Sequence, residues 1–135
     1  MEDGGKEEEG IWEENRKVGE AIGSGPEAER LVGECEARLA QLSPVRAGRT
    51  SQAFGIRRVL CIEWLDPLYL AGHWVPELVM AAGGEDVGAE PGPQSMRRSW
   101  AEATQLRPDL ILVMLCGFDV ARAGGELAAL TNPLA

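Results

Sequence analysis

The residues best suited to contact a ligand are concentrated in one short stretch, CIEWLDPLYLAGHW, which spans residues 61–74. It holds Trp64 and Trp74, the chain's only tyrosine, Tyr69, and its only histidine, His73. Aromatic rings with few charges around them are suited to a large, flat, partly apolar ligand. The stretch therefore predicts a binding face, although each tryptophan could instead cap the core and His73 could close the start of a helix.

Patterns that would support catalysis are absent from the sequence. There is no G-x-S-x-G motif, no glycine-rich phosphate loop after an apolar strand pattern and no H-E-x-x-H helix. Cys116 and His73 could form a nucleophile–base pair, but nothing in their spacing favours one. No second histidine or paired cysteine supports His73 as a metal ligand. We predict that the chain is not an enzyme and has no metal or cofactor of its own.

The composition of the chain argues against some classes of binding partner. The 135 residues are 44% apolar and 26% charged, as in one globular domain, with a net charge of −9. That charge argues against nucleic acid and anionic lipid as partners. The first thirty residues contain no apolar signal region, and the longest apolar run, residues 110–118, is about half of a membrane span. As written, the chain is expected to be cytoplasmic and to have no membrane span.

The elements that must position the aromatic stretch follow from local patterns. Residues 1–10 read as a disordered acidic tail, residues 11–42 as helix broken at GSGP (residues 23–26), and residues 43–56 as a linker. A buried strand is predicted over residues 58–63 and a helix over residues 75–82, ended by Gly83 and Gly84. Ser99 to Glu102 has the form of a capping box that starts a helix. A second strand is predicted over residues 109–115 and a final helix over residues 120–130.

Strands separated by helices pair in parallel, so residues 57–135 predict an α/β lobe with a partial parallel, Rossmann-like sheet. Parallel neighbours open their carboxyl ends on one edge, where ligands bind. That edge would carry the aromatic and acidic side chains of both connections: Trp64, Asp66, Tyr69, His73, Trp74, Phe118 and Asp119. Two strong strands make a small sheet, so we expect the lobe to be incomplete.

The three cysteines, Cys35, Cys61 and Cys116, are odd in number and widely spaced, with no C-x-x-C pair. Cys61 and Cys116 fall in or beside apolar runs, where thiols usually act as small core residues.

Two long blocks, RVLCIEWLDPLYLAGHWVPELVMAAGGEDVG and SWAEATQLRPDLILVMLCGFD, resemble the second lobe of class III periplasmic-binding proteins. These are the capture subunits of vitamin B12 and iron–siderophore ABC importers. Upstream, NRKVGEAIGSGPEAERLVGECEARL is similar to the segment leading into that family's lobe-joining helix, so the resemblance covers about residues 11–130. The family is periplasmic or extracytoplasmic, has two lobes and catalyses no reaction.

The resemblance implies that the chain binds a corrinoid or an iron chelate and docks on an ABC permease. Carried over by position, the ligand-facing residues are Glu63, Trp64, Asp66, Pro67, His73, Trp74, Cys116, Gly117, Phe118 and Asp119. Glu102 is the nearest candidate for the acid that meets the permease, because Ala101 stands where an acid is common. With the first lobe absent, we expect ligand binding to be weak or lost. The alternative is a non-functional fragment or a protein-interaction module that uses its open sheet edge and the stripe Leu31, Val32, Cys35, Leu39 and Leu42.

Overall fold

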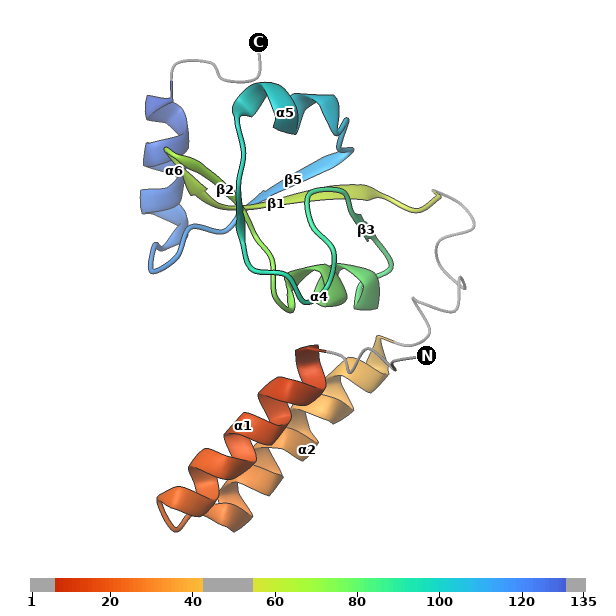
Figure 1. Cartoon of the computed structure of the whole chain (residues 1–135), viewed down its shortest axis with the longest axis vertical. Coiled ribbons are helices and arrows are strands. Elements are labelled where there is room, and N and C mark those ends of the chain that lie inside the picture. Colours follow the sequence, from red (N-terminus) through yellow and green to blue (C-terminus); the bar gives the residue numbers. More distant parts are fainter. Residues whose placement is uncertain (1–6, 43–54, 131–135) are drawn as a thin grey trace.

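The computed structural model describes residues 7–42 and 55–130, so the tail before Glu7 and nearly all of the predicted linker lie outside the described residues. The described chain forms a helical hairpin followed by an α/β lobe (Figure 1). The helical hairpin consists of α1 (Glu7–Ala21) and α2 (Gly25–Gln41). Among the described residues, no helix combines the length and apolar character required to cross a membrane.

The predicted break between the two helices is confirmed. Gly23 has a positive φ of 74°, which ends the first helix, and Pro26 lies in the first turn of the second, where its missing N–H costs nothing. The helical segment was predicted to start at residue 11, which was wrong by four residues. α1 begins at Glu7, inside the expected acidic tail. Glutamate is a good helix former, so the acidic run continues the helix instead of ending it.

The sheet of the lobe is built around one long strand, β1 (Arg58–Leu65). On one edge, β3 (Glu85–Asp86) pairs in parallel with the start of β1, and β2 (Leu68–Leu70) pairs antiparallel with its end. Next to β2 lies β4 (Met96–Arg97). On the other edge, β5 (Leu110–Val113) runs parallel to β1, from Val59 beside Leu110 to Ile62 beside Val113.

The parallel pairing predicted for the two strong strands is therefore confirmed, but the sheet as a whole is mixed. The predicted connection after the first strand is not only a loop, because Asp66 and Pro67 form a tight turn with a cis peptide bond and the chain returns as β2. A three-residue strand has no periodicity of its own, and β2 is a strand because the edge of β1 offers it hydrogen bonds.

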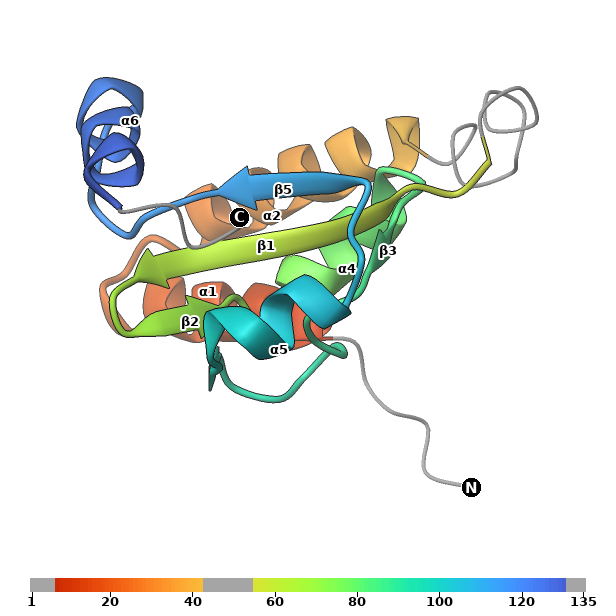
Figure 2. The same cartoon turned by 90° about the horizontal axis from the view of Figure 1, so that it is seen from above.

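Helices cover both faces of this sheet (Figure 2). α4 (Val75–Ala81) covers a small apolar cluster on one face, formed by Val59, Cys61, Ala71 and Val79. The larger cluster on the other face is packed under α5 (Trp100–Gln105) and α6 (Val120–Ala129), and it consists of Leu60, Ile62, Leu65, Leu68, Leu70, Ala103 and Leu115. α6 lies beside the carboxyl ends of β1 and β5, where the sequence predicts the binding edge.

The capping box predicted at Ser99 is confirmed. The Ser99 Oγ accepts a hydrogen bond from the Glu102 N–H at 3.2 Å, and the Glu102 Oε2 accepts one from the Ser99 N–H at 2.8 Å. These two bonds satisfy donors that the first turn of a helix leaves unpaired.

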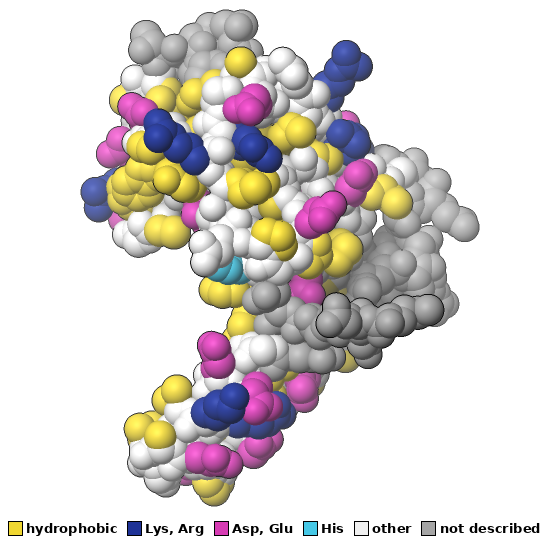
Figure 3. All heavy atoms as spheres, in the orientation of Figure 1, with side chains coloured by type: hydrophobic (Ala, Val, Ile, Leu, Met, Phe, Trp, Pro, Cys, Tyr) yellow, Lys and Arg dark blue, Asp and Glu magenta, His cyan; other side chains and the backbone are white. Residues whose placement is uncertain are grey.

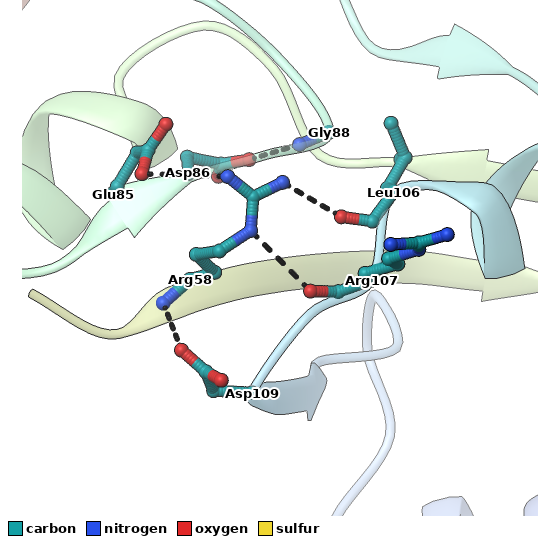
Figure 4. A network of polar contacts seen from close by, with 7 residues as sticks. All are labelled: Arg58, Glu85, Asp86, Gly88, Leu106, Arg107 and Asp109. Carbon is teal, nitrogen blue, oxygen red and sulfur yellow. Dashed lines mark hydrogen bonds and ion pairs between the residues drawn. The ribbon is translucent and has the colours of Figure 1, made fainter.

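At the opposite end of the sheet, Arg58 ties four elements together (Figure 4). Its backbone N–H donates to the Asp109 carboxylate at 2.9 Å, at the start of β5. Its guanidinium donates to the carbonyl oxygens of Leu106, at 2.8 Å, and Arg107, at 3.3 Å, which end α5. An ion pair at 3.7 Å joins it to Glu85 on β3. This network orients β1, β5 and α5 together, and so helps to place the far ends of the two strands side by side.

Candidate functional site

A pocket of about 390 Å³ lies where β1 and β5 end and α6 begins. We call it the strand-end pocket. Its walls combine aromatic, aliphatic and charged side chains: Trp64, Leu65, Asp66, Leu115, Phe118, Arg122, Glu126, Ala129 and Leu130. The parallel pairing of β1 with β5 puts both strand ends at this edge.

Trp64, Phe118 and Arg122 form a compact cluster in this pocket. The rings of Trp64 and Phe118 meet edge to face, with centroids 5.6 Å apart and an interplanar angle of 73°. The Arg122 guanidinium lies 3.7 Å from the centroid of the Phe118 ring, a cation–π contact. The Asp119 Oδ1 accepts a hydrogen bond of 2.8 Å from the Arg122 N–H, which caps α6 and fixes the position of this turn.

The turn after β1 supplies the opposite side of the pocket. The Trp64 Nε1–H donates to the Asp66 carbonyl oxygen at 3.1 Å, which orients the indole. Tyr69 lies directly opposite Trp64 in the β1–β2 ladder, so the two side chains are on one face of the sheet. Pro67 lines a neighbouring shallow groove with Asp66 and Glu102.

Glu63 takes no part in the walls of the strand-end pocket. Ile62 pairs with Leu70 and Trp64 with Tyr69, so β1 has one more residue than β2 over this interval, and Glu63 is the extra residue of a β-bulge. The bulge leaves the Glu63 side chain half-buried.

His73 and Trp74 are not brought to the strand-end pocket. Because β2 runs back along β1, the chain has left the carboxyl edge when it reaches His73. The two rings lie 5.6 Å apart, and Trp74 lines a separate cavity between α4 and the helical hairpin, which we call the hairpin cavity. The residues predicted to form one site are thus divided between two places.

Cys61 and Cys116 differ in their exposure to solvent. Cys61 is buried as predicted, and burial together with the charge of Asp86 raises the pKa of its thiol to about 12, so it is not a nucleophile near neutral pH. The prediction of a core position for Cys116 was wrong, because β5 ends at Val113 and the thiol is exposed in the following turn with Gly117. Within residues 7–42 and 55–130, no three His, Cys, Asp or Glu side chains converge to hold a metal ion.

Arg122 and Glu126 line the pocket but are not among the residues predicted from the sequence. One signal was available: they follow Asp119 by three and seven residues, a spacing that places side chains on one helix face when Asp119 caps the helix. In the described part of the chain, no carboxylate forms an ion pair with Arg122, and its side chain is exposed.

Glu102, the predicted permease contact, is exposed at the start of α5. Its Oε2 also accepts a hydrogen bond of 2.8 Å from the Ser99 hydroxyl, and the bonds from Ser99 lower the pKa of its carboxyl. The side chain is therefore anionic at neutral pH, and it stabilises the helix locally.

Comparison with known proteins gives a consistent picture of the fold. No protein-family model matches the chain, and no curated protein matches it. Among solved structures, a periplasmic heme-binding protein of Pseudomonas aeruginosa matches 95% of this chain and 46% of its own, with a TM-score of 0.72 and 18% identity. The periplasmic heme-binding protein RhuT from Roseiflexus sp. RS-1 matches 76% of this chain and 39% of its own, with a TM-score of 0.57 and 26% identity.

The periplasmic vitamin B12-binding protein BtuF of Vibrio cholerae matches 89% of this chain and 44% of its own, with a TM-score of 0.61 and 17% identity. In each comparison the chain spans less than half of the solved protein's length. The described part of the chain therefore has the α/β fold of one lobe of the class III periplasmic-binding proteins.

Proposed function

We propose that the strand-end pocket binds a flat metal chelate, a corrinoid or an iron chelate such as heme, as the contribution of one lobe of an ABC-import substrate-binding protein. The observation that carries this proposal is the cluster of Trp64, Phe118 and Arg122 at the carboxyl ends of two parallel strands. The likeness of the fold to heme-binding and vitamin B12-binding proteins supports the same class of ligand.

The chemistry of the cluster suits such a ligand. The two rings offer apolar area against a macrocycle, and the exposed guanidinium can form a bidentate pair with a peripheral carboxylate. A pocket of about 390 Å³ lies near the lower end of the range for small-molecule sites. A macrocycle would therefore remain partly uncovered, and we expect weak binding by this chain alone.

Titration with hemin and with cyanocobalamin, followed by visible absorbance and calorimetry, tests the proposal. Replacing Trp64 with alanine should weaken binding of the favoured chelate by about tenfold. Val120 is 91% exposed on the same helix as Arg122 and outside the pocket walls, so Val120→Ala is the matched control and should leave binding unchanged. If Trp64→Ala binds as well as the parent chain, the site assignment is wrong.

A variant of Arg122 should affect the binding of hemin and of cyanocobalamin differently. Arg122→Gln removes the charge but keeps a similar length, and it should weaken hemin, which carries carboxylates, by about tenfold. Cyanocobalamin has amides in place of free carboxylates and only one phosphodiester, so its binding should change less than that of hemin. Equal loss for both ligands would mean that Arg122 acts by packing on Phe118.

Transport would require a surface that meets the permease, and we assign Glu102 to it as an exposed anion on the lobe. Because Glu102 also caps α5, Glu102→Gln must be compared with Ser99→Ala, which disturbs the same cap and retains the acid. Loss of permease binding in the first variant alone would support the assignment.

A second candidate function, a protein-interaction module, rests on β5. Within the described sheet β5 pairs only with β1. Its Leu110 and Leu112 are 48% and 42% exposed, and Met114, just after the strand, is 43% exposed. An open apolar strand edge favours pairing with another strand, here a second copy of the chain. Light scattering after size exclusion should then show a dimer that Leu112→Lys disrupts, and a monomer at high concentration contradicts this candidate.

A further inference from the structure

The hairpin cavity has a volume of about 540 Å³ and lies between the helical hairpin and α4. Figure 3 shows hydrophobic side chains where the lobe meets the helices. The apolar walls come from α1, α2, α4 and the residue that precedes α4: Ile11, Trp12, Cys35, Leu39, Trp74 and Leu78. These residues are far apart in the sequence, and the tertiary structure alone gathers them.

The walls remain open to solvent in this structure. Trp74 is 44% exposed and Leu78 is 42% exposed, whereas Trp12, Cys35 and Leu39 are half-buried. Two indole rings, one from the hairpin and one from the lobe, line the same hollow. Its volume falls within the range of sites that bind small molecules, and its lining is mainly apolar, as such sites usually are.

The polar groups at this cavity carry opposite charges. Glu14 on α1 and Arg38 on α2 both line it, and neither side chain has a hydrogen bond or ion pair with another residue of the described chain. Their charges offset each other, so the cavity has no preference for an ionic ligand. The net charge of −9 also disfavours an anion.

We infer that the hairpin cavity is a second binding site, separate from the strand-end pocket, for an uncharged flat aromatic molecule held between Trp12 and Trp74. The match to the heme-binding protein of Pseudomonas aeruginosa covers 95% of this chain, so the aligned residues include the hairpin as well as the lobe. A ligand here would contact both parts and hold them together.

The uncharged dye N-phenyl-1-naphthylamine, whose emission rises in apolar sites, is a direct probe. With the full chain we expect a saturable increase in emission. Trp12→Ala and Trp74→Ala should each weaken binding by about tenfold, since each removes one aromatic wall. Val18, 60% exposed on the same helix as Trp12 and outside the cavity, provides the control variant Val18→Ala, which should bind as the parent does.

A cavity-filling variant keeps the test decisive if a tryptophan variant fails to fold. Cys35→Phe places a ring inside the cavity from α2, so the dye should no longer bind while the melting temperature stays the same or rises. Binding that persists in Cys35→Phe and in both tryptophan variants overturns the inference. It is also overturned if the dye does not bind and light scattering shows a dimer that Trp74→Ala dissociates, because the cavity is then a contact between two copies.

Discussion

Among single residues, the half-buried carboxyl of Asp86 is subject to two opposing effects, burial and hydrogen bonding. Its Oδ1 accepts hydrogen bonds from the N–H groups of Gly88, at 2.8 Å, and Ala89, at 3.1 Å, and so orders the loop after β3. Its Oδ2 is buried, and the Cys61 thiol interacts with the same carboxyl. Burial raises the pKa of the Asp86 carboxyl, although the two N–H bonds oppose that rise.

The expected consequence is a stability difference that depends on pH. Because the pKa of Asp86 is higher in the folded chain than its ordinary value of 3.8, its favourable contribution is complete below pH 3.8 and is lost as the pH rises through the folded pKa. Asp86→Asn does not titrate and keeps an acceptor for both N–H groups. Urea unfolding should therefore show this variant gaining stability relative to the parent between pH 4 and 7.

Asp86→Ala is the control for that experiment. It leaves both N–H groups without their acceptor and should lower the free energy of unfolding by about 2 kcal/mol at every pH. A constant difference between the parent and Asp86→Asn across the pH range would contradict the role of burial.

At the scale of elements, the helical hairpin depends on one close approach. Gly19 is buried on α1, and a Cβ added there would clash with the Ala28 Cβ on α2. The N–H of Ser24, in the turn between the helices, donates to the Gly19 carbonyl oxygen at 2.7 Å. Apart from Gly19, Val32 is the one fully buried residue of this hairpin in the described range, so close backbone packing provides much of its stability.

Two glycine-to-alanine changes should therefore have opposite effects. Gly19→Ala forces the helices apart and should destabilise the hairpin by about 2 kcal/mol. Gly33→Ala lies within α2, where an added Cβ meets no atom within 4 Å, and should stabilise it by about 1 kcal/mol through helix propensity. Circular dichroism melts of both variants measure the difference, and destabilisation of equal size would show that α2 requires Gly33 for another reason.

At the scale of the whole molecule, the apolar core belongs to the lobe. Both core clusters are built from residues 59–130, and the helical hairpin contributes no buried residue to either. Helices of 15 and 17 residues with little buried surface are marginal in water without tertiary packing. The two parts should therefore differ in local stability.

Hydrogen exchange measured by mass spectrometry tests this difference. We expect peptides from α1 and α2 to exchange at least about tenfold faster than peptides from β1, since local opening of the hairpin does not require the lobe to unfold. Saturation of the hairpin cavity with N-phenyl-1-naphthylamine should slow exchange in the hairpin, because a ligand there contacts both parts. Equal protection of α1, α2 and β1 without ligand would show that hairpin and lobe unfold as one unit.

Features that depend on neighbouring residues could be predicted from the sequence. The break at Gly23, the capping box of Ser99 and Glu102, the two main strands and their parallel pairing were all predicted from local signals. Hydrogen bonds within one turn and hydrophobic periodicity act over a few residues, so the sequence displays them directly. The resemblance to one lobe of a binding protein came from the same two blocks of residues.

Which side chains share a site, in contrast, depends on how distant parts of the chain pack together. β2 exists because β1 has an edge to pair with, and its return carries Trp74 away from Trp64. The bulge at Glu63 and the start of α6 at Asp119 set which side chains line the strand-end pocket, including Arg122 on Phe118. Such pairings join residues separated by many others in the chain, and their geometry depends on packing that no short stretch of sequence contains.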